Sequence, residues 1–152
     1  MATILLIEDA PGRGFGEAAA LEAAGHRVLR CGGGPAAFTP CPLLDQTARS
    51  LASTAELIVF ACPLFQPLWG RSYSGAELLH AYRSHPEYGS LPMVVVTAED
   101  PGHIEGTGPL EVAAATSWGE AVEAVDRLLA AAIGGRGTPS TKQALCTSER
   151  SR

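Results

Sequence analysis

The stretch TILLIEDAPGRGFGEAAALEAAGHRVLRCG, residues 3–32, decides the fold class. It opens with a short continuous apolar run, which is typical of a parallel strand covered on both faces. Apolar residues then recur near helical spacing from Phe15 to Ala24, and Gly25 is a residue type that commonly ends helices. A second, weaker strand follows over residues 26–32. This order of strand, helix and strand predicts a parallel sheet with crossover helices.

The rest of the chain continues the alternation. The expected elements are a helix over residues 40–55, a strand over 56–62, a helix over 75–85 that stops before Pro86, strands over 91–100 and 111–117, and a helix over 118–135 that ends at paired glycines. We therefore predict one α/β domain over residues 1–133, with helices on both faces of the sheet. The polar residues 134–152 are expected to form a flexible C-terminal tail.

Composition and charge exclude several classes of protein. A hydrophobic share of 46% with a mean hydropathy of +0.11 argues against a largely disordered chain. The net charge is -5 and no basic run precedes the tail, so direct binding to nucleic acid is not expected. The N-terminal apolar run has no basic region before it and stops at Glu8, which indicates a first strand and not a signal peptide. No stretch approaches the length of a membrane span.

Cysteines and histidines show no metal-site or catalytic pattern. No two cysteines form a CxxC pair, which favours reduced structural thiols in a cytoplasmic protein. No histidine has a ligand spacing with an acidic residue in reach, and no nucleophile elbow is present. We therefore expect no enzyme activity and no cofactor. The residues concerned are Cys31, Cys41, Cys62, Cys146, His26, His80, His85 and His103.

A glycine-rich turn after the first strand has more than one interpretation. Gly12, Gly14 and Gly16 approach a dinucleotide fingerprint, but Glu17 stands at the third glycine position. The carboxylates of Glu8 and Asp9 would also repel a phosphate group there. The same pair could instead serve as hard oxygen ligands for Mg²⁺, or Asp9 could cap the following helix. The acidic pair alone does not decide between these interpretations.

The order of features along the whole chain resembles the receiver domain of two-component response regulators. The resemblance is carried by residues 4–34, 55–61, 75–98 and 118–129, and it covers about residues 3–130. It implies a flavodoxin-like, CheY-like three-layer αβα fold whose five-stranded parallel sheet has the order 2-1-3-4-5. Residues 99–111 contain three glycines and two prolines where the family has its fourth helix, so that helix is expected to be shortened or missing.

The resemblance assigns roles to five positions. Glu8 and Asp9 fall on the family's Mg²⁺-binding acidic pair, and Thr97 falls on its switch hydroxyl. Ala61 stands where the family has its phospho-accepting aspartate, and Ala114 stands where it has its lysine. Phosphoryl transfer requires a nucleophile and charge neutralisation around the phosphorus. We therefore expect an aspartate-less receiver domain with weak Mg²⁺ binding at best.

Contact residues are expected on two segments. The connection after the third strand, residues 62–75, is longer than the family's and carries Phe65, Trp69 and Tyr73, which either form a contact surface or fold back into the vacated pocket. Trp118 begins the last helix and either anchors a partner or packs on its own domain.

These features predict a stand-alone atypical response regulator that acts through phosphorylation-independent protein-protein interaction. The expected partner is a sensor kinase, another regulator or a second copy in a homodimer, with no nucleic acid and no membrane. The alternative is a small flavodoxin-like nucleotide- or ligand-binding protein or enzyme that uses the Gly12–Gly16 turn.

Overall fold

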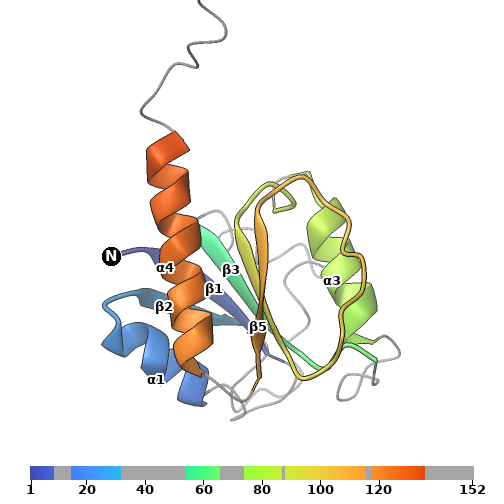
Figure 1. Ribbon diagram of the computed structural model, residues 1–152, viewed down its shortest axis with the longest axis horizontal. Helices are drawn as coiled ribbons and strands as arrows, with labels where there is room; N and C mark the ends of the chain where they lie inside the picture. The colour runs from blue at the N-terminus through green and yellow to red at the C-terminus, as the bar shows by residue number, and fades with distance from the viewer. Residues whose placement is uncertain (9–14, 32–53, 66–73, 87, 116–117, 136–152) are drawn as a thin grey trace, which may run out of the picture.

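The computed structural model describes residues 1–8, 15–31, 54–65, 74–86, 88–115 and 118–135 (Figure 1). Strands and helices alternate along the chain, as the sequence predicts. The helix expected over residues 40–55 falls almost entirely outside the described residues. The elements are β1 (Thr3–Glu8), α1 (Phe15–Ala23), β2 (Arg27–Cys31), β3 (Leu57–Ala61), α3 (Gly75–Ser84), β4 (Met93–Thr97), β5 (Leu110–Ala114) and α4 (Trp118–Gly135).

The five strands form one parallel sheet in the order β2-β1-β3-β4-β5, which confirms the predicted fold class and topology. Helices α1 and α4 lie on one side of this sheet and α3 lies on the other (Figure 1). Because the chain order reverses between β1 and β3, the carboxyl ends of these central strands form the usual place for a site in such a sheet.

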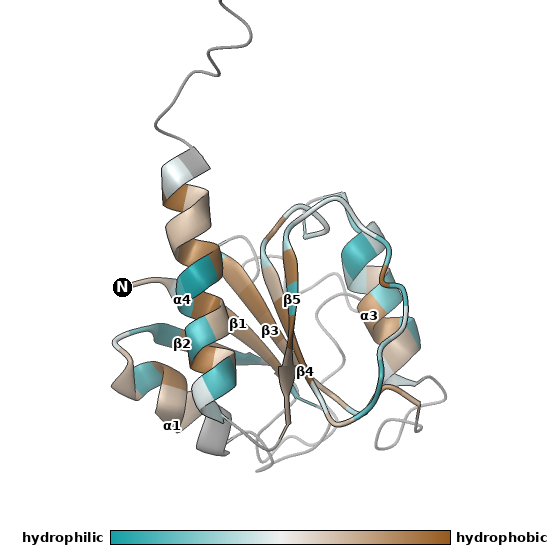
Figure 2. Cartoon of the chain, in the orientation of Figure 1, coloured by the Kyte–Doolittle hydropathy of each residue, from teal (hydrophilic) through white to brown (hydrophobic). Residues whose placement is uncertain are grey.

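Strand β1 shows how the two cores are built. Its side chains alternate, so Ile4 and Leu6 pack against α1 and α4, whereas Leu5 and Ile7 pack in the cluster that contains α3. All four are at most 1% exposed. A strand buried on both faces must be apolar along its whole length, and Figure 2 shows this hydrophobic colouring on β1 and β3.

Helix α3 begins at a capping box. Ser74 Oγ accepts a hydrogen bond from the Glu77 backbone N–H at 3.3 Å, and the Glu77 carboxylate accepts one from the Ser74 backbone N–H at 2.8 Å. These reciprocal bonds satisfy donors that a helix start leaves without partners. The Ala76 backbone N–H also donates to the Leu64 carbonyl at 2.8 Å, which links the start of α3 to the segment after β3.

No helix is present between β4 and β5, where every residue is described. The helix that the resemblance places between these strands is therefore missing, as predicted, and α4 is the helix expected over residues 118–135. Residues 98–109, which we call the strap, connect β4 to β5 without helical structure. Gly102 and Gly106 have φ of 61° and 144°, values that favour glycine. The glycines therefore make the strap's path accessible and oppose helix formation.

Arg83 on α3 holds the strap in place. Its Nε donates to the Glu105 carbonyl at 3.2 Å and its Nη2 donates to the Gly108 carbonyl at 2.7 Å. The side chain is buried, and its Nη1 has no hydrogen-bond partner among the described residues. Desolvation lowers the pKa of the Arg83 guanidinium, because burial disfavours the charged form.

Candidate functional site

The carboxyl edge of the sheet brings four predicted site residues together. Glu8 at the end of β1 pairs directly with Ala61 at the end of β3, and Thr97 at the end of β4 pairs with Ala114 at the end of β5. Parallel strands place their carboxyl ends along one edge, so the four residues lie along the same edge of the sheet. Asp9, the other half of the acidic pair, lies outside the described residues.

Glu8 is engaged by an arginine that the sequence analysis did not single out. Arg30 on β2 donates from Nε to Oε1 of Glu8 at 3.3 Å and from Nη2 to Oε2 at 3.1 Å. The Glu8 side chain is only 1% exposed, whereas the Arg30 side chain is 26% exposed. This bidentate pair neutralises the buried carboxylate and fixes the direction of both its oxygens.

The Arg30–Glu8 pair disfavours magnesium binding at Glu8. Both oxygens of Glu8 accept hydrogen bonds from a cation, so Mg²⁺ would have to compete with the Arg30 guanidinium for them. The neighbouring strand end supplies only the methyl group of Ala61. Within the described part of the chain, no group of three His, Cys, Asp or Glu residues could hold a metal ion.

The end of β3 carries no nucleophile on the side of the sheet that Ala61 faces. Ala61 packs against the cluster that contains α1 and α4. Cys62 is 2% exposed and packs in the cluster on the opposite face, where its thiol donates to the Ile7 carbonyl with a sulfur–oxygen distance of 3.7 Å. The thiol is therefore a core group and does not replace a missing carboxylate.

Thr97 is buried, and its hydroxyl is used locally. Thr97 Oγ1 accepts a hydrogen bond from the Glu99 backbone N–H at 3.0 Å. The Glu99 carboxylate in turn accepts a hydrogen bond from the Leu64 backbone N–H at 2.8 Å. Glu99, which the sequence analysis did not single out, therefore ties the start of the strap to the segment that follows β3.

The end of β5 presents no charged side chain to the site. Ala114 is exposed, and its backbone N–H donates to the Glu120 carboxylate at 3.1 Å. Trp118 is partly buried against the core that α4 forms with the sheet, so it packs on its own domain. Further along α4, Arg127 lies beside Glu111 of β5, and the hydrogen bond that Arg127 donates to the Glu111 carboxylate raises the pKa of Arg127.

Of the predicted contact residues after β3, only Phe65 is described. It is 65% exposed and is one of four large apolar residues that are exposed in the described part of the chain. Trp69 and Tyr73 lie outside the described residues, as do Gly12 and Gly14 of the glycine-rich turn. Gly16 belongs to the first turn of α1.

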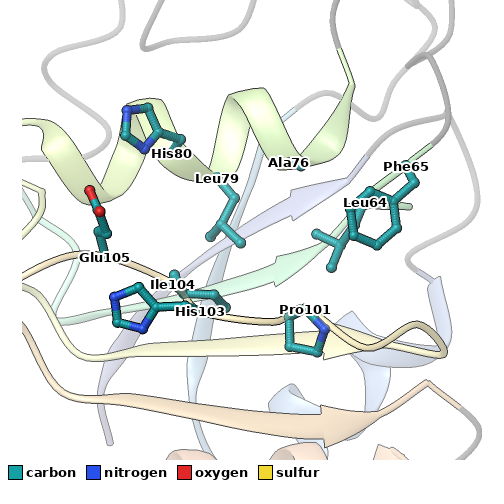
Figure 3. Close-up of a pocket in the computed structure, with 9 residues that line it drawn as sticks. All are labelled: Leu64, Phe65, Ala76, Leu79, His80, Pro101, His103, Ile104 and Glu105. Carbon is teal, nitrogen blue, oxygen red and sulfur yellow. The ribbon is translucent and has the colours of Figure 1, made fainter.

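A cavity of about 280 Å³ lies between α3 and the strap, where a fourth helix is missing (Figure 3). Its walls combine apolar side chains with the polar groups of two histidines and one glutamate. Figure 3 shows Leu79 of α3 facing Ile104 of the strap, with Phe65 and Leu64 near Pro101. The lining residues are Leu64, Phe65, Ala76, Leu79, His80, Pro101, His103, Ile104 and Glu105.

Comparisons with known proteins identify the fold. No protein-family model matches this sequence, and no curated protein matches it. Among solved structures, chemotaxis protein CheY4 of Vibrio cholerae is 21% identical with a TM-score of 0.55, covering 84% of this chain and 98% of that chain. A response regulator receiver domain protein from Bacillus halodurans is 21% identical with a TM-score of 0.56, covering 84% of this chain and 96% of that chain. The chain has the receiver fold.

A third match extends the same likeness. The signal receiver domain of a signal transduction histidine kinase from Syntrophus aciditrophicus is 21% identical with a TM-score of 0.56, covering 92% of this chain and 96% of that chain. The receiver fold thus spans nearly the whole length of each of these structures.

None of the helices that the structure describes has the length and apolar character needed to cross a membrane.

Proposed function

We propose that this chain is an aspartate-less receiver domain that acts in signal transduction through protein-protein interaction and accepts no aspartyl phosphate. The observation that carries the proposal is the composition of the carboxyl edge. Ala61 stands beside Glu8 in the register of β1 and β3, and Arg30 binds both oxygens of the Glu8 carboxylate. Ala61 offers no nucleophile, and a metal ion would have to compete with Arg30 for the Glu8 oxygens.

Internal charge pairing supports a site with one stable state. A receiver switch requires a charge change that biases a bistable element. Here the carboxylate of Glu8 is paired with Arg30, the Thr97 hydroxyl accepts a hydrogen bond from the Glu99 N–H, and the Glu99 carboxylate accepts one from the Leu64 N–H. Each of these three polar groups therefore already has an internal partner.

The surface beside this edge supports a binding role. Phe65 is exposed and forms part of the cavity that the missing helix leaves between α3 and the strap. A rigid aromatic side chain beside a partly apolar cavity is typical of the residues that contribute most to protein interfaces. We infer that a partner protein contacts the domain here.

Affinity capture from the native cell tests this proposal. We expect Phe65→Ser to lose the main partner, because it removes the exposed aromatic group without touching the core. Val112→Ser is the matched control, since Val112 is exposed at 49% on β5 and does not line the cavity. Treating the bait with acetyl phosphate and Mg²⁺ should leave the captured partner unchanged. Retention of the partner by Phe65→Ser, or capture that requires acetyl phosphate, would contradict the proposal.

A further inference from the structure

A second, larger cavity of about 760 Å³ lies at the opposite, amino edge of the sheet. It is bordered by the residues that directly precede all five strands and by the last turns of α4, and we call it the amino-edge groove. In Figure 1, α4 projects beyond the sheet at its C-terminal end, which leaves its last turns without a sheet to pack on. Apolar groove residues include Met1, Ala55, Leu91, Pro92, Leu129 and Ile133.

Exposed apolar residues line the amino-edge groove. Four large hydrophobic residues are exposed in the described part of the chain, and two of them, Met1 at 101% and Ile133 at 75%, line this groove. Figure 2 shows hydrophobic colouring on the last turns of α4. Contiguous exposed apolar surface of this kind commonly marks an interaction site.

The polar groups of the amino-edge groove favour a basic occupant. Glu56 and Asp126 contribute carboxylates, and Glu56 also accepts a hydrogen bond from the Thr3 backbone N–H at 2.8 Å. Among the described lining residues, the basic groups are the His26 ring and the N-terminal amino group of Met1. Asp126 Oδ1 lies 3.1 Å from His26 Nε2, and its side chain remains 59% exposed. The C-terminal end of α4 adds the negative end of a helix dipole, and no basic residue lies in its last turn.

Residues 136–152 of the same chain have the matching chemistry. They contain four basic residues, Arg136, Lys142, Arg150 and Arg152, against the single acidic residue Glu149. The apolar run Ala144-Leu145-Cys146 lies between the basic positions. An apolar centre with basic flanks complements an apolar groove with acidic margins.

The chain also has the reach that docking requires. Residue 136 directly follows the last turn of α4, whose Ala132 and Ile133 line the amino-edge groove. Leu145 lies ten positions beyond Gly135, and an extended chain of ten residue steps spans about 33 Å. Gly134, Gly135 and Gly137 surround the point where the chain must reverse its direction, and glycines allow such a turn.

We propose that residues 136–152 dock back into the amino-edge groove. Leu145 covers the apolar surface around Ile133 and Leu129, and the basic flanks face Asp126 and Glu56. The contact is intramolecular and lies at the edge of the sheet opposite Ala61. It is therefore independent of the proposed signalling function, and either proposal can fail without the other.

Amide hydrogen exchange on the full-length chain tests this docking. We expect Leu145→Asp to raise exchange in residues 129–135 about tenfold, because a buried carboxylate would oppose docking. Thr138→Asp is the control, since it adds the same charge outside the apolar run and should change exchange much less. A synthetic peptide of residues 136–152, added to the Leu145→Asp chain, should restore protection, and raised salt should weaken that rescue.

Two results would overturn the docking proposal. One is equal exchange in residues 129–135 for wild type and Leu145→Asp, together with no effect of the added peptide. The other is protection of the same residues that rises with protein concentration alongside a doubled mass in sedimentation, which would assign the amino-edge groove to a second copy of the chain.

Discussion

Arg30→Met is expected to lower the free energy of unfolding by about 3 kcal/mol, the range found when one partner of a buried ion pair is removed. The substitution would leave the Glu8 carboxylate, which is 1% exposed, without its bidentate partner. Urea unfolding at neutral pH measures the loss. Because the substitution also frees both Glu8 oxygens, added Mg²⁺ should stabilise Arg30→Met more than it stabilises the wild type.

Two variants make the Arg30 prediction specific. Arg127→Met removes an arginine that also pairs with a glutamate, but its side chain is 60% exposed, so a much smaller change is expected. The double variant Glu8→Gln, Arg30→Met should regain part of the lost stability, because it leaves no buried charge. If the Arg30→Met variant were as stable as the wild type, the ion pair between Arg30 and Glu8 would not stabilise the site.

Arg83→Ala is expected to release the strap from α3 and to lower the free energy of unfolding by about 3 kcal/mol. The guanidinium donates to the Glu105 and Gly108 carbonyls, and both would lose that charged donor. Hydrogen exchange in residues 99–108 should rise, whereas exchange in α1 serves as an internal reference because α1 packs on the other face of the sheet.

Gly106→Ala tests the same contact from the strap. A Cβ at residue 106 would meet the Arg83 guanidinium, and the φ of 144° is unfavourable for alanine. This variant should therefore loosen the strap as Arg83→Ala does. Gly102→Ala is the matched control, because its φ is also positive but nothing lies within 4 Å of the added carbon. Unchanged strap exchange in Arg83→Ala would contradict the role assigned to Arg83.

The fold could be predicted because its elements have strong local patterns. The amphipathic run that ends at paired glycines predicts a helix over residues 118–135, and α4 spans Trp118–Gly135. The apolar run at residues 3–7 predicts a doubly buried strand, which β1 is. The glycines and prolines within residues 99–111 predicted that the fourth helix is shortened or missing.

The candidate site was only partly predictable, because its partners meet through strand register. Leu6 of β1 pairs with Arg30 of β2, and this register brings the Arg30 side chain to Glu8, two residues further along β1. A basic residue in the strand beside an acidic strand end was the available signal. Glu99 and Arg83 gave no such signal, since their partners are backbone groups of distant segments.

The most direct test of the central claim is intact-mass spectrometry after incubation with acetyl phosphate and Mg²⁺. The wild-type chain should gain no phosphoryl group, because Ala61 offers no nucleophile and Glu8 is held by Arg30. Ala61→Asp is the matched variant, since it restores a carboxylate beside Glu8 and shows whether the surrounding site can support transfer. A stoichiometric phosphoryl adduct on the wild-type chain would contradict the proposal of an aspartate-less receiver that works without phosphorylation.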